Sequence, residues 1–73
     1  MIENEEIARE VSDLMIDYGR RLNESLVRVQ DHCTDEEFRL YRAAVGKVLG
    51  EMLLEIMNPL YQKHPGLKPE GLK

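Results

Sequence analysis

The sequence predicts an all-α protein: an antiparallel helical hairpin that assembles as a homodimeric four-helix bundle. Three observations favour this fold. Apolar residues recur every three or four positions in two long segments, a helix-capping pattern separates the segments, and the second segment is apolar on more sides than one neighbouring helix covers. The chain has 73 residues and a formal net charge of -4. A chain this short suits one domain and buries a small fraction of its surface when alone.

The first helix is expected over about residues 5–30. Asn4 is a favoured N-cap residue, and Glu5 and Glu6 follow it in the first turn, where negative charge stabilises a helix. A stripe of apolar residues then recurs at intervals of three and four positions and stays on one helical face. Its members are Val11, Met15, Tyr18, Leu22, Leu26, Val29 and Cys33.

A neighbouring row on the same helix contains small residues. It consists of Ser12, Ile16, Gly19, Asn23 and Val27. A glycine inside a helix costs about 1 kcal/mol relative to alanine, but the apolar stripe continues in phase on both sides of Gly19. We therefore expect one unbroken helix, with a row along which another helix can approach closely.

The turn between the helices carries the clearest local pattern in the chain. Thr34 and Glu37 match a capping box, in which the hydroxyl accepts from the Glu37 amide and the carboxylate reaches back to the cap. Only residues 31–34 remain to reverse the chain. Connections this short leave two helices as antiparallel neighbours.

The second helix is expected over about residues 35–57, and it is apolar on two faces. One face, which we expect to meet the first helix, holds Phe38, Tyr41, Val45, Val48, Met52 and Ile56. The other requires a further partner, because leaving leucine-sized side chains in water forgoes about 1.5–3 kcal/mol each. We therefore predict a contact with a second copy, in which two glycines permit close approach. Its residues are Val45, Gly46, Leu49, Gly50, Leu53 and Met57.

Pro59 should end or bend the second helix, because proline lacks an amide hydrogen and its ring displaces the preceding turn. Asn58 can cap a further short turn after Pro59. Residues 1–63 thus form the predicted hairpin domain. Residues 64–73 contain two more prolines and two glycines, and we expect them to be an extended, mobile tail.

The sequence contains no spacing typical of a metal, cofactor or catalytic site. His32 and the single cysteine, Cys33, are adjacent in the turn, and neighbouring side chains do not naturally converge on one ion. We therefore expect no metal, no cofactor and no enzymatic activity. The first ten residues lack the basic and apolar pattern of an export signal, and no apolar run approaches the roughly 20 residues of a membrane span. A cytoplasmic protein is expected.

These features lead to one functional hypothesis and one alternative. The hypothesis is a small homo-oligomeric module that binds another protein or regulates it. The alternative is a nucleic-acid-binding regulator that uses Arg9, Arg20 and Arg28 on the first helix. An acidic chain binds phosphate poorly unless its cations gather on one surface, and acids lie near these arginines, so nucleic acid is the less favoured partner.

Overall fold

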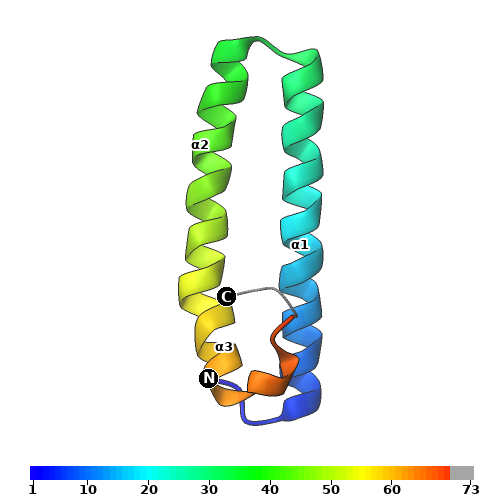
Figure 1. The fold of residues 1–73 in the computed structure, drawn as a ribbon, viewed down its shortest axis with the longest axis vertical. Coiled ribbons are helices and arrows are strands. Elements are labelled where there is room, and N and C mark those ends of the chain that lie inside the picture. Colours follow the sequence, from blue (N-terminus) through cyan, green and yellow to red (C-terminus); the bar gives the residue numbers. More distant parts are fainter. Residues whose placement is uncertain (70–73) are drawn as a thin grey trace.

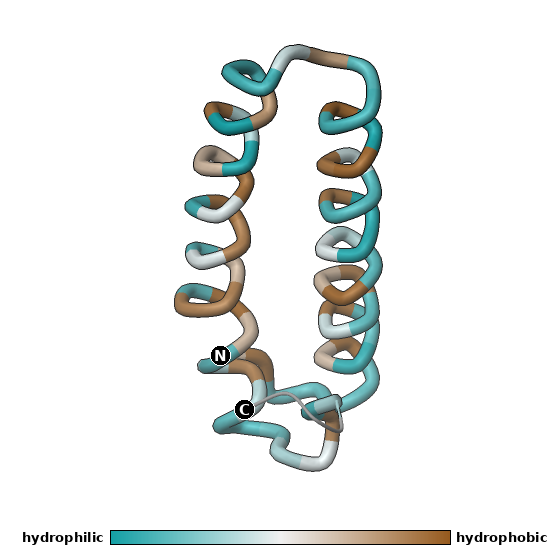
Figure 2. The backbone as a smooth tube through the Cα atoms, turned by 45° about the horizontal axis from the view of Figure 1, so that its top comes forward, coloured by the Kyte–Doolittle hydropathy of each residue, from teal (hydrophilic) through white to brown (hydrophobic). Residues whose placement is uncertain are grey.

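The computed structural model describes residues 1–69 as an all-helical chain. Two long helices, α1 (Glu5–His32) and α2 (Asp35–Glu51), lie side by side and run in opposite directions (Figure 1). The predicted helical hairpin is confirmed. Figure 2 shows hydrophobic segments on the sides where the two helices face each other and hydrophilic ones on the outer side of α1.

Both helices begin with the caps that the sequence predicts. The Asn4 side chain accepts a hydrogen bond from the Ile7 amide at 3.1 Å. At the turn, Thr34 Oγ1 accepts from the Glu37 amide at 3.1 Å, and Glu37 Oε1 accepts from the Thr34 amide at 2.9 Å. The backbone and side-chain hydrogen bonds from Thr34 lower the pKa of Glu37. The capping box therefore fixes both the start of α2 and the reversal of the chain.

The second arm of the hairpin differs from the single helix predicted over residues 35–57. After α2, a π-helical turn, η1 (Met52–Met57), leads directly into a short helix, α3 (Asn58–Lys63). The Asn58 amide donates to the Leu53 carbonyl, one residue further back than in an α-helix. In a regular α-helix, the ring of a proline clashes with the carbonyl group four residues before it. The wider π-helical turn relieves this clash, so the helical chain continues through Pro59.

The best-buried part of the chain lies at the open end of the hairpin, where α3 meets the beginning of α1. Ala8 and Leu60 are fully buried, and Tyr61 is almost so. The Tyr61 hydroxyl and Ser12 Oγ share a buried hydrogen bond of 2.6 Å. Four partly buried residues pack around this cluster: Ile2, Val11, Met57 and Leu67.

Both chain ends contribute to closing this end of the hairpin. Lys63 Nζ donates to Glu3 Oε1 at 2.8 Å, and His64 Nε2 donates to the Ile2 carbonyl at 2.6 Å. A 3-10 turn, η2 (Pro65–Leu67), then brings Leu67 against the core cluster, where the sequence predicts an extended segment. The mobility of the tail stays a prediction, and residues 70–73 lie outside the described residues.

The middle of the hairpin has fewer buried residues than the open end. Val45 is 3% exposed, and Ser25 Oγ lies 2.7 Å from the Tyr41 hydroxyl between the two arms. The radius of gyration is 14.5 Å, whereas a compact chain of this length has one of about 11 Å, so the hairpin is elongated.

No helix within residues 1–69 combines the length and the apolar character that crossing a membrane requires.

The buried hydroxyl pair makes the first testable prediction. Tyr61→Phe should lower the free energy of unfolding by about 1–2 kcal/mol, because the Ser12 hydroxyl loses its buried partner. Denaturant titration at one fixed protein concentration measures the change. Tyr18→Phe is the matched control, since Tyr18 is more than half exposed. Equal stability of the Tyr61→Phe variant and the wild type would contradict this role of the pair.

Candidate interaction surface

An open groove of about 740 Å³ lies along one side of the hairpin, between α1 and the second arm. We call it the α1/η1 groove. The row of small and apolar residues predicted on the first helix supplies much of one wall, through Ile16, Gly19, Asn23 and Val27. The other apolar side chains that line it are Met15, Leu49, Met52, Met57 and Pro69. Its volume lies within the range of small-molecule sites, which are likewise lined mostly by apolar side chains.

One glycine, Gly19, lines the groove, and two others lie on α2. Gly19 faces Leu49, and a methyl group added at Gly19 would lie 3.8 Å from Leu49 Cδ2. Gly46 and Gly50 lie on α2, and a methyl group at either position would meet no atom within 4 Å. Neither glycine is therefore required by packing within the hairpin.

The structure separates the six residues of the predicted self-association contact. Leu49 and Met57 line the α1/η1 groove. Gly46 is exposed, and Gly50 and Leu53 are half-buried. Val45, which the sequence assigns both to the hairpin face and to the contact, is buried within the hairpin itself. Its side chain therefore contributes to the hairpin core in a single chain.

Several apolar residues at the groove remain in water. Ile16 is 43% exposed and Val27 is 55% exposed. The three methionines of the groove, Met15, Met52 and Met57, are half-buried. Methionine is flexible and polarisable, so it adapts to the shape of whatever packs against it.

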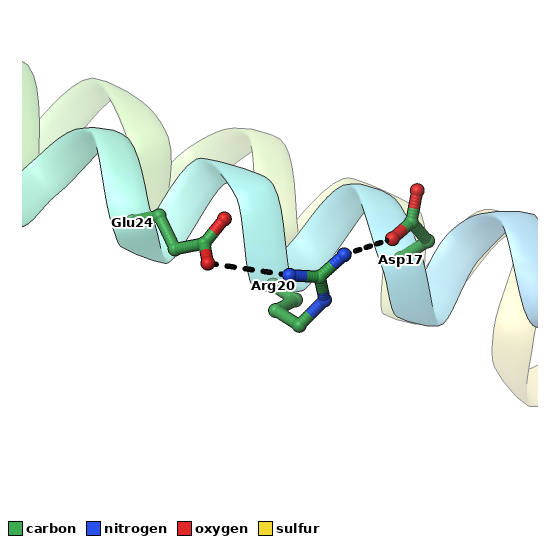
Figure 3. A network of polar contacts seen from close by, with 3 residues as sticks. All are labelled: Asp17, Arg20 and Glu24. Atoms are coloured by element: carbon green, nitrogen blue, oxygen red, sulfur yellow. Dashed lines mark hydrogen bonds and ion pairs between the residues drawn. The ribbon is translucent and has the colours of Figure 1, made fainter.

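The rim of the groove carries paired charges. Arg20 Nη2 donates to Asp17 Oδ1 at 2.6 Å, and Arg20 Nη1 donates to Glu24 Oε2 at 3.2 Å (Figure 3). The hydrogen bond to Asp17, together with the charge of Glu24, raises the pKa of Arg20. Arg20 and Glu24 line the groove, whereas Asp17 lines the smaller hollow described below, and the two carboxylates offset the guanidinium charge.

The other two arginines of the predicted partner-binding set lie elsewhere on α1. Arg9 Nη2 lies 4.0 Å from Oε1 of Glu5, which is one helical turn earlier. Arg28 is exposed and forms no ion pair with another residue in the range 1–69. Only Arg20 lines the groove, so the structure does not bring the three arginines together at this surface.

A second, smaller hollow of about 360 Å³ includes two residues that are more than half exposed, Leu14 and Tyr18. Leu22, Ser25 and Tyr41 complete its floor between the helices. The hairpin thus has apolar residues in two separate hollows. Members of the apolar stripe of α1 take part in both, Met15 in the α1/η1 groove and Tyr18 and Leu22 in the smaller hollow. The helical period of α1 predicts these residues.

The turn residues His32 and Cys33 are both exposed. Within residues 1–69, no group of three or more histidine, cysteine, aspartate or glutamate side chains is placed to hold a metal ion.

Comparison with protein-family models, with curated proteins and with solved structures finds no match to this chain. The function is therefore inferred from the chemistry of its surfaces.

Proposed function

We propose that this chain is a small protein-interaction module that pairs with a second copy through the α1/η1 groove and forms a four-helix bundle. The module has no catalytic activity of its own and serves to bind or regulate another protein. Its single cysteine is exposed and free, which suits a reducing compartment such as the cytoplasm. The observation that carries this proposal is the half-exposed apolar lining of the groove.

The surface area of the single chain supports a second copy as the occupant of the groove. The chain exposes 5678 Å², whereas a compact monomer of 8.5 kDa exposes about 4,700 Å². The excess is about 1,000 Å², and each partner in a standard protein interface buries about 800 Å². One interface of ordinary size therefore brings the chain to the exposure expected of a compact protein.

The charges around the groove permit a copy of the same chain as its occupant. The whole chain carries a net charge of -4, so two copies repel each other at long range. At the rim, however, Arg20 is paired with acids of its own helix. A two-fold contact places the same surface on both sides, and this rim presents charges of both signs to itself. Paired rim charges keep the local repulsion small.

The smaller hollow gives the module a surface for another protein. Leu14 and Tyr18 belong to this hollow and do not line the α1/η1 groove. A contact confined to the groove leaves them exposed in the dimer. A dimer that buries the groove of each hairpin therefore exposes two copies of the smaller hollow. Such a repeated surface suits the binding of another protein.

A charge placed in the groove tests the proposed contact. Val27→Asp should weaken the dimer roughly 100-fold or more, because the contact would bury an unpaired carboxylate. The folded hairpin should be little affected, since Val27 is 55% exposed and valine and aspartate have similar helix propensities. Light scattering gives the molar mass, and circular dichroism gives the helix content.

Leu40→Asp is the matched control for this variant. Leu40 is 66% exposed on α2 and does not line the groove, so its replacement should leave the dimer intact. If Val27→Asp and Leu40→Asp had the same molar mass as the wild type, the groove would not be the contact surface. If both variants were monomers, the loss would not be specific to the groove.

Gly50 belongs to the self-association contact that the sequence predicts but does not line the α1/η1 groove, so it tests whether the proposed dimer extends beyond the groove along α2. If it does, Gly50→Leu should weaken the dimer about tenfold or more, because a bulky side chain obstructs a close helix crossing. In the single chain, a Cβ atom added at Gly50 meets no other atom within 4 Å. Leucine also favours the helix over glycine by about 1 kcal/mol, so the substitution should not destabilise the single hairpin. Ala44→Leu adds a leucine at an exposed position of the same helix that does not line the groove. A Gly50→Leu dimer as tight as the Ala44→Leu dimer would rule out a close crossing at Gly50.

A further inference from the structure

Three of the four methionines in the chain line the α1/η1 groove. Met15 comes from α1, whereas Met52 and Met57 are the first and last residues of the π-helical turn η1. All three are half-buried in the single chain, and the groove is open on its outer side. The fourth, Met1, is 61% exposed and does not line the groove. Small oxidants therefore have access to a cluster of thioethers in the unpaired chain, which is in equilibrium with the proposed dimer.

We propose that Met15, Met52 and Met57 form a modification site, at which reversible oxidation by a hydroperoxide controls self-association. This inference rests on the proposed function, because it concerns the same groove. The oxidised groove prevents pairing, and the reduced groove permits it. The oxidant is hydrogen peroxide or another hydroperoxide, and the product is methionine sulfoxide.

The chemistry at each side chain is a transfer of one oxygen atom. A lone pair of the thioether sulfur attacks one peroxide oxygen, the O–O bond breaks, and an S–O bond forms. For hydrogen peroxide, the second oxygen leaves as hydroxide and takes up the proton that the sulfur-bound oxygen releases, which gives water and the sulfoxide. The sulfur is oxidised by two electrons and the peroxide is reduced by two. Methionine sulfoxide reductases reverse the change, with one enzyme for each sulfoxide epimer.

The groove is poorly equipped to hold the product inside a contact. A sulfoxide oxygen is a strong acceptor and needs a donor when it is removed from water. The side-chain donors that line the groove are the amide of Asn23 and the guanidinium of Arg20, which uses two of its five N–H groups on Asp17 and Glu24. Both residues belong to α1, whereas Met52 and Met57 lie on the opposite wall, in η1. Each sulfoxide that remains unpaired should weaken the dimer roughly 10- to 100-fold.

The experiment uses the full chain with Cys33→Ser, so that thiol oxidation does not contribute. Hydrogen peroxide is added to this protein and to the same protein with Met15→Leu, Met52→Leu and Met57→Leu. Leucine is close to methionine in volume, so the triple variant should still pair. Peptide mass spectrometry identifies the oxidised residues, and light scattering gives the molar mass before and after oxidation. Met1 is the internal control for oxidation outside the groove.

The expected result has two parts. Peroxide should dissociate the protein that keeps its three groove methionines, and sulfoxide reductases should restore the dimer. The triple leucine variant should stay dimeric although Met1 is oxidised. The inference is overturned if the groove methionines are oxidised without dissociation, if they resist peroxide that oxidises Met1, or if the triple variant dissociates equally. A monomer before any peroxide is added would instead refute the proposed dimer, and this inference with it.

Discussion

Two helices that lie side by side cover only one stripe on each other, and this geometric limit governs the whole molecule. In the hairpin, burial is close to complete only at Val45 and at the open end, where Ala8, Leu60 and Tyr61 meet. Most other apolar side chains of the two arms are only partly covered. The α1/η1 groove exists because α1 carries apolar residues to the side of that stripe, where α2 does not reach. These side chains stay partly exposed to water in the single chain.

The departure from a simple hairpin occurs at the proline of the second arm. The π-helical turn η1 lets the chain continue through Pro59 into α3. This continuation brings Leu60 and Tyr61 onto α1, where the Tyr61 hydroxyl meets Ser12. The same turn places Met52 and Met57 in the wall of the groove. The core at the open end and two side chains of the groove wall thus depend on one local change in helical pitch.

Local signals made much of the fold predictable. The caps at Asn4 and Thr34 depend on side chains within one turn of the helix, and both occur as predicted. The apolar period likewise identifies both arms of the hairpin and the row of α1 that lines the groove. The π-helical turn was not predicted, because it reflects a compromise between the Pro59 ring and continued packing of the arm. The core role of Leu60 and Tyr61 follows from that turn and has no periodic signal of its own.

The central claim is that a second copy of the chain covers the apolar surface that one hairpin leaves in water. Sedimentation equilibrium of the unmodified protein at micromolar concentrations, in reducing buffer, tests it most directly. A single species of twice 8.5 kDa, which dissociates only on dilution, is the result expected. A stable, cooperatively melting monomer of 8.5 kDa at those concentrations would contradict the claim.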